Sequence, residues 1–206
     1  MLRYYLLREI PFGQDGSISE ASIEGRYNAE LANGLGNLLS RSSALCEKNA
    51  VVFAPWAGAE AADQELLAVA ANTKARYLKS MEALAFHDAL EAINELIRAA
   101  NKYVDERAPW ALAKDKSEAG QVALAHALYA MAEASRLCFV ALAPFMPQTA
   151  DKGFALLGYA PGSVLGPRSE AQGSSLEQLL DWGGLPGGIS LKKGDGLFPR
   201  REAVKA

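Results

Sequence analysis

Long stretches of the chain carry an apolar residue at every third or fourth position, the spacing that gives a helix one apolar face. The clearest stretch is 86–107, which ends two residues before Pro109. Its apolar positions are Phe86, Ala89, Leu90, Ile93, Leu96, Ile97, Ala100, Tyr103 and Val104. The same spacing predicts helices over 61–84, 118–142 and 148–157. Long amphipathic helices joined by short loops form antiparallel bundles.

The first fifty residues carry weaker helix signals, and these depend on capping residues. Ser17 and Glu20 have the S-x-x-E spacing of a capping box, which predicts that a helix starts there. Gly25 and Asn28 predict a break and a new N-cap, with a second helix over 29–48.

Glycine and proline separate the end of the chain from the helices. Residues 57–158 hold 4 Gly and 3 Pro, whereas residues 160–206 hold 9 Gly and 4 Pro. A long helix is therefore expected only in the first stretch, and the second has room for one short element near 175–182. The fold class predicted is all-α: a helix bundle with a C-terminal tail rich in Gly and Pro.

Charge and cysteine content exclude several classes of protein. The 206 residues include 21 basic and 24 acidic ones, a net charge of -3, which excludes a strongly cationic nucleic-acid coat but allows a local basic patch. No apolar run approaches the ~18 residues of a membrane span. Cys46 and Cys138 are too few for a zinc site and are expected to be inert, packed thiols.

The usual signs of an enzyme active site are missing. No G-x-S-x-G, Walker A, dinucleotide-binding or HExxH motif occurs, so no catalytic, cofactor-binding or metal-binding residue is assigned. His87 is expected to be a surface residue and His126 a satisfied interior or boundary one. Two free thiols and no signal-peptide pattern favour a reduced, cytoplasmic protein.

Two segments remain unusual. Asn33, Asn37 and Arg41 fall four apart, which stacks them on one helix face. Gly34 and Gly36 lie between them, each costing ~1 kcal/mol relative to Ala in a helix interior. Either close backbone packing or close approach of a ligand offsets that cost, and the pattern alone favours packing.

The second unusual segment is Pro109-Trp110, directly after the clearest helix. The tryptophan is either a core anchor or a flat ring held on the surface. From the residues alone, the core anchor is favoured.

Both segments closely resemble the anticodon-binding helical domain of the methionyl-tRNA synthetase family. Residues 27–41 (YNAELANGLGNLLSR) resemble its start and residues 103–110 (YVDERAPW) its second anticodon segment. Further similarities follow in the family's order. Residues 2–9 and 11–16 resemble the stretch after the KMSKS loop, and residues 143–147 resemble a late bundle helix. Residues 182–187 and 197–200 resemble the tail that folds back in this family. Residues 49–60 and 166–175 depart from the pattern, so Trp56 inherits no role.

The resemblance implies a site and its partner, the anticodon loop of methionine tRNA. Asn33, Asn37 and Arg41 match positions that hydrogen-bond anticodon bases. Trp110 matches the position that stacks on the first anticodon base, and Pro109 holds it. Single-stranded bases are recognised by such stacking and by bonds to their edges.

The resemblance also implies a division of the chain and of the activity. Residues 1–16 would be a remnant of the stem-contact segment following the KMSKS loop, 17–158 the anticodon-binding bundle, and 159–206 a tail folding back toward the catalytic domain. The HIGH and KMSKS segments are absent, so this chain is expected to supply tRNA binding without catalysis to a methionine–tRNA ligase. The resemblance implies that ATP binds in the catalytic portion and leaves open whether that portion also holds a zinc ion. No cofactor is expected in this chain.

Two alternatives stay open at this point. Other class I synthetases, of leucyl, valyl or cysteinyl type, share the bundle, although the Asn33, Asn37, Arg41 and Pro109-Trp110 set argues against them. A stand-alone helical protein-interaction module is the other. An exposed Trp110 would argue against that module, and a buried one would favour it.

Overall fold

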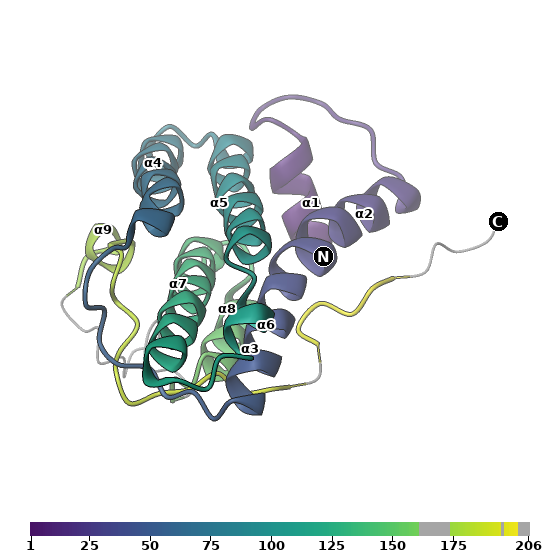
Figure 1. Cartoon of the computed structure of the whole chain (residues 1–206). Helices are drawn as coiled ribbons and strands as arrows, with labels where there is room; N and C mark the ends of the chain where they lie inside the picture. The colour runs from purple at the N-terminus through teal and green to yellow at the C-terminus, as the bar shows by residue number, and fades with distance from the viewer. Residues whose placement is uncertain (161–173, 195, 202–206) are drawn as a thin grey trace.

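The computed structural model of the chain describes residues 1–160, 174–194 and 196–201. These residues form helices and connections without a β-strand (Figure 1), which confirms the all-α prediction. Most of the departing segment 166–175, and part of the C-terminal tail 159–206, lie outside the described residues.

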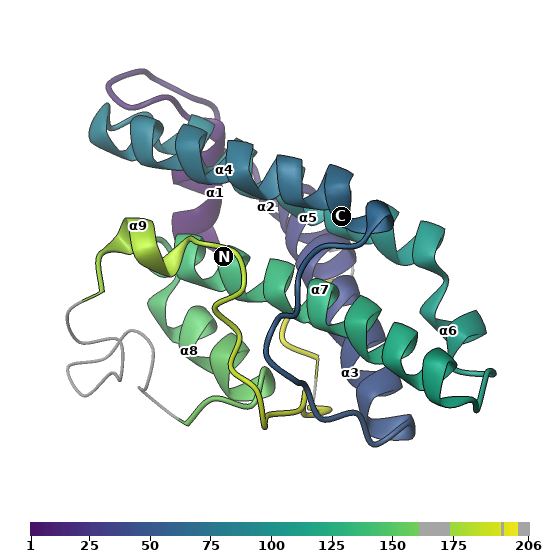
Figure 2. The ribbon, with the colours of Figure 1, turned by 60° about the vertical axis from the view of Figure 1, so that its left-hand side comes forward.

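Three long helices make the body of the bundle. They are α4 (Gln64–Glu82), α5 (Phe86–Arg107) and α7 (Glu118–Leu142), and the bounds of α5 and α7 are those that the sequence predicts. The short 3-10 turn η2 (Ala61–Asp63) precedes α4, so a helix does begin at residue 61 as expected. Figure 2 shows α7 running back beneath α4 and α5.

The core lies around α7, which is buried on nearly every side. Leu124, Leu128, Met131 and Phe139 are fully buried along it. A helix that is apolar all round belongs in the centre of a protein rather than on its surface. Helix α8 (Pro147–Leu156) packs on α7 and ends before Gly158, whose positive φ of 95° closes the helix.

The N-terminal region differs from the prediction. Helix α1 (Leu2–Glu9) is followed by α2 (Glu20–Arg26), which continues through the π-helical segment η1 (Tyr27–Gly36) into α3 (Asn37–Lys48). The predicted break at Gly25 and Asn28 is therefore wrong, and so is the predicted start at Ser17.

Side-chain bonds explain both errors. Ser19 is the N-cap, because its Oγ accepts from the Ser22 amide at 3.1 Å while Ser22 Oγ accepts from the Ser19 amide at 3.2 Å. Asn28 caps no helix, because its side chain donates to the Arg201 carbonyl and accepts from the Arg201 amide. Both bonds reach across 173 residues, so local spacing could not indicate them.

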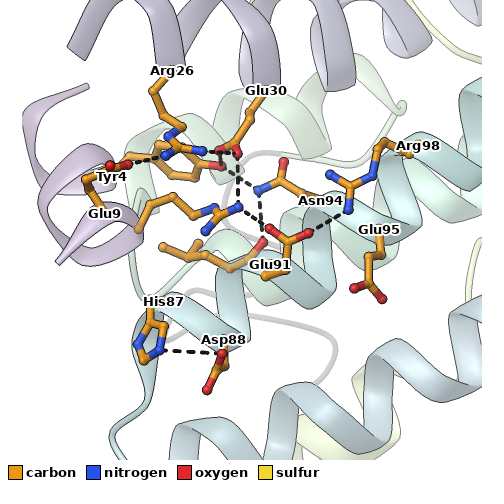
Figure 3. Close-up of polar contacts among 12 residues, drawn as sticks. Tyr4, Glu9, Arg26, Glu30, His87, Asp88, Glu91, Asn94, Glu95 and Arg98 are labelled. Carbon is orange, nitrogen blue, oxygen red and sulfur yellow. Dashed lines mark hydrogen bonds and ion pairs between the residues drawn. The ribbon is translucent and has the colours of Figure 1, made fainter. Parts of the chain in front are cut away.

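A polar cluster fixes α1 and η1 to α5 (Figure 3). The Tyr4 hydroxyl donates to Glu30 Oε2 at 2.7 Å and accepts from Asn94 Nδ2 at 2.9 Å. Arg8 lies between two carboxylates, 3.1 Å from Glu30 and bonded to Glu91. Burial, the largest cause, and the nearby Glu30 carboxylate raise the pKa of Tyr4 above its ordinary value. The cluster therefore positions the helix that continues into the candidate site.

A buried ion pair fastens the described part of the tail to the bundle. Glu133 on α7 is fully buried and accepts hydrogen bonds from the amides of Gly183, Gly184 and Leu185 at 2.8, 3.0 and 2.9 Å. Arg136 donates two bonds to the same carboxylate. The only helix of the described tail, α9 (Leu176–Leu179), is the short element expected near 175–182.

Candidate nucleic-acid interface

The site residues on α3 lie against α5. Asn37 Nδ2 donates to Asn101 Oδ1 at 3.3 Å, and Arg41 Nη2 donates to Asp105 Oδ1 at 2.8 Å. Positions 37 and 41 meet 101 and 105 in the same order, so the two helices run in the same direction here. The bonded pairs stand one helical turn apart along the surface.

Trp110 is presented on the surface next to this row. Ala108 adopts a left-handed conformation with φ of 44°, which ends α5 and starts α6 (Pro109–Leu112) in a new direction. Pro109 is buried at the first position of that helix, while Trp110 is 44% exposed. The prediction of a core anchor from the residues alone is wrong, and the exposed ring argues against the interaction-module alternative.

The ring is partly covered by its neighbour. Arg41 Cζ lies 5.2 Å from the centroid of the Trp110 ring, within range of a cation–π contact. The Arg41 guanidinium therefore makes two contacts at once, an ion pair with the Asp105 carboxylate and a cation–π contact with the Trp110 ring. The structure thus brings Arg41 and Trp110 together, and Asn37 lies one helical turn before Arg41 on the same helix.

Asn33 lies about one turn before Asn37 and is exposed within η1. Its side chain makes no hydrogen bond to another described residue. Asn33, Asn37 and Arg41 therefore form a row of two amide groups and one guanidinium group that reaches the exposed Trp110 ring at Arg41, an arrangement that suits the edges and faces of unpaired bases.

The glycines of η1 allow close packing, as the pattern alone favoured. A Cβ on Gly34 would lie 3.0 Å from Ile97 Cγ2 on α5, and one on Gly36 would lie 3.1 Å from the Leu31 carbonyl oxygen. The Gly34 carbonyl also accepts from Asn101 Nδ2 at 3.3 Å. Segments of π-helix occur often at functional sites.

Sequence reasoning missed Asn101 and Asp105. They are polar residues four apart on the exposed side of α5, the same spacing as Asn37 and Arg41. That spacing was a usable signal, but only a known packing of α3 on α5 pairs the two rows.

A second polar group lies under the connection that precedes α4. Asp63 is fully buried, and its carboxylate bonds to His126 Nε2 at 2.7 Å, to the Tyr103 hydroxyl at 2.7 Å and to the Glu60 amide at 2.7 Å. Burial raises the pKa of Asp63, but these bonds outweigh it and lower the pKa below its ordinary value. His126 is thus a satisfied boundary residue, as expected.

Trp56, which the resemblance left without a role, covers this second group. Its ring stacks on Tyr129 with centroids 5.2 Å apart and lies 4.7 Å from the His126 ring. The two cysteines, Cys46 and Cys138, are free and buried, and burial raises the pKa of Cys46 to about 12. Both thiols are packed as expected.

Within the described residues, no group of three or more His, Cys, Asp or Glu side chains could hold a metal ion. In the same part of the chain, no helix is both long and apolar enough to cross a membrane.

Two family models match the chain. The model described as "Anticodon binding domain of methionyl tRNA ligase" matches residues 54–172. The model described as "tRNA synthetases class I (M)" matches residues 1–43.

Curated relatives agree. The methionine–tRNA ligase of Caldanaerobacter subterraneus is 39% identical over 206 residues, covering 99% of this chain and 30% of that protein. The ligase of Bacillus subtilis is 38% identical, covering 98% of this chain and 29% of that protein. The chain therefore spans about a third of the length of the relatives it matches.

Solved structures show the same fold. The free form of Mycobacterium tuberculosis methionyl-tRNA synthetase superposes with a TM-score of 0.83 at 40% identity, over 98% of this chain and 39% of that one. Its complex with methionyl-adenylate gives 0.80 at 40% identity, over 97% and 37%.

The bundle and its matched models define a class I tRNA synthetase domain of the anticodon-binding type. The chain belongs to the methionyl-tRNA ligase family. The leucyl, valyl and cysteinyl alternatives are thereby set aside.

Proposed function

We propose that this chain recognises the anticodon loop of methionine tRNA on behalf of a methionine–tRNA ligase. The observation that carries the proposal is the exposed ring of Trp110, held by buried Pro109 beside Arg41 and Asn37. A tryptophan that served as a core anchor would have its ring buried. A patch that binds protein would not need the row of Asn33, Asn37 and Arg41 next to the ring.

The geometry supports a recognition step in which one base replaces Arg41 on the ring. Stacking on an aromatic side chain contributes about 1–3 kcal/mol per base. The cation–π contact it displaces is worth only about 0.5–1 kcal/mol at an exposed site. The guanidinium N–H groups of Arg41 that do not bond to Asp105 can then donate to a base edge or a phosphate, and Asn33 and Asn37 offer both donors and acceptors.

Catalysis in this proposal belongs to the rest of the ligase. The parent reaction would join methionine to its tRNA with ATP, in a catalytic domain that is this chain's other partner. Any zinc ion would also belong there, and the compartment would be the cytoplasm. The purified 206-residue chain is expected to show no methionine-dependent exchange between ATP and pyrophosphate.

Binding of two RNA hairpins tests the recognition step. A hairpin with a CAU loop and one with a scrambled loop are titrated against the chain, and the CAU loop is expected to bind more tightly. Affinity should be modest, because the net charge of -3 gives little long-range attraction to phosphate.

Substitutions at the site sharpen the test. Trp110→Ala should cost about 1–3 kcal/mol with the CAU hairpin, while Trp110→Phe should keep much of the binding because a π-face remains. Asn37→Ala and Arg41→Ala should each cost about 1–3 kcal/mol if they contact base edges. Phe12→Ala, at a ring that is 69% exposed on another loop, is the matched control. Equal affinity for both hairpins, or no loss with Trp110→Ala, would overturn the proposal.

A further inference from the structure

A second groove lies on the side of α3 next to the candidate interface. It forms where the described tail passes beside α3, as the yellow segment in Figure 1 does, and it holds about 100 Å³. Its helical wall includes Gly36 at the end of η1 and Ser40 and Ala44 on α3, and its tail wall includes Lys192 and Lys193.

The charged groups among the described residues that line this groove are all positive. Lys192 and Lys193 are exposed and form no ion pair with another described residue. None of the described residues lining the groove is acidic. Among the described residues, the groove therefore carries two ammonium groups without an ion-pair partner.

The backbone that carries the lysines is held in place. The Ile189 carbonyl accepts from the Phe53 amide at 2.9 Å, and the Lys192 amide donates to the Leu156 carbonyl at 2.8 Å. Leu191 between them is buried. This segment is fixed to the bundle before any ligand arrives, which lowers the entropy cost of binding.

The groove borders the face that carries the anticodon-recognition residues. At 100° per residue, Ser40 points about 60° away from Asn37 around the axis of α3. Gly36 and Ser40 directly precede Asn37 and Arg41 in the sequence, so the two surfaces share one stretch of helix.

We propose that this groove holds the phosphate backbone of the RNA strand that leaves the base stacked on Trp110. The inference rests on the proposed function and names a contact beyond it, with Lys192 and Lys193 binding phosphate. Proteins that bind single strands combine a positive groove along the backbone with aromatic rings for the bases. Trp110 supplies the ring, and the tail supplies the groove.

Salt dependence of hairpin binding separates the two surfaces. Each phosphate contact on a single strand contributes about 0.7 to the slope of log affinity against log salt. Lys192→Gln/Lys193→Gln should therefore lower the magnitude of that slope by about 1.4. Between 50 and 200 mM salt, the double variant should then lose about sevenfold less affinity for a hairpin than the unsubstituted chain loses. The loss should be equal for the CAU and scrambled hairpins, because phosphate carries no sequence information.

Control variants make the result specific. Lys192→Arg/Lys193→Arg keeps both charges and should keep the slope. Lys79→Gln removes an exposed lysine of α4 that has no ion pair with another described residue and should leave the slope unchanged. Trp110→Ala should reduce the preference for CAU while the slope stays as it was.

An unchanged slope in the double glutamine variant, with the CAU preference intact, would overturn the groove and leave the proposed function standing. Equal binding of both hairpins by the unsubstituted chain would overturn the proposed function, and a slope lowered by about 1.4 would still support the phosphate contact. A chain that binds neither hairpin would overturn both.

Discussion

Replacing Glu133 with glutamine is expected to loosen the tail and to destabilise the whole bundle. The Glu133 carboxylate is fully buried and accepts five hydrogen bonds, three from the amides of Gly183, Gly184 and Leu185 and two from Arg136. Arg136 is itself only 3% exposed. A single carboxylate thus neutralises a buried cation and holds residues 183–185 of the tail.

The magnitude follows from what glutamine removes. Its amide nitrogen cannot accept a bond, so one side of the carboxylate loses its partners, and the buried charge of Arg136 is left unbalanced. Removing one partner of a buried ion pair typically costs about 3–5 kcal/mol. Domains of this size are stable by about 5–15 kcal/mol, so the loss is a large share of the total.

Urea unfolding and amide hydrogen exchange measure the effect. Glu133→Gln should lower the unfolding free energy by that amount, and exchange should accelerate first at Gly183, Gly184 and Leu185. Glu177→Gln on α9 is the matched control, because its side chain is 69% exposed and lies 3.9 Å from Lys74. That pair is expected to contribute less than about 1 kcal/mol. A Glu133→Gln loss below about 1 kcal/mol, with unchanged exchange at the three amides, would refute the reasoning.

Two further predictions concern the bundle. Gly153→Ala should lower the unfolding free energy by about 1–3 kcal/mol, because the new Cβ would overlap the Phe139 ring. Gly25→Ala should raise the unfolding free energy by up to about 1 kcal/mol, because the space around its Cβ is open. Urea titration of both variants measures the two changes. The lowered pKa of Asp63 adds stability above about pH 4 that is lost as pH falls through the folded-state pKa, so the difference in unfolding free energy between the unsubstituted chain and Asp63→Asn should shrink over the range from about pH 4 downward. A constant gap across that range would assign the acid sensitivity to other carboxylates.

The long helices were predictable because their signal is local. The apolar spacing of 86–107 and 118–142 gives the exact bounds of α5 and α7. The S-x-x-E spacing predicts the start of α2 two residues too early, because Ser19 and Ser22 form the capping box instead. The continuous passage through η1 was missed, because Asn28 bonds to Arg201 at the far end of the chain.

The candidate site also has a part that the sequence predicts and a part that it does not. The pattern and the family resemblance indicate Asn33, Asn37, Arg41, Pro109 and Trp110, and the structure places Arg41 against the exposed Trp110 ring, with Asn37 one helical turn before Arg41 and Pro109 buried at the start of α6. Whether they contact RNA stays a prediction.

The sequence by itself determined the helices, the Gly- and Pro-rich tail and the residue types of the site, because each follows from neighbours within about two turns of helix. Only the tertiary structure decided that Trp110 faces solvent and that Lys192 and Lys193 border α3. Those placements depend on contacts between residues far apart in the chain, such as the hydrogen bond from the Gly183 amide in the tail to the Glu133 carboxylate on α7. Long-range packing sets where each local element points, and no periodicity along the chain records it.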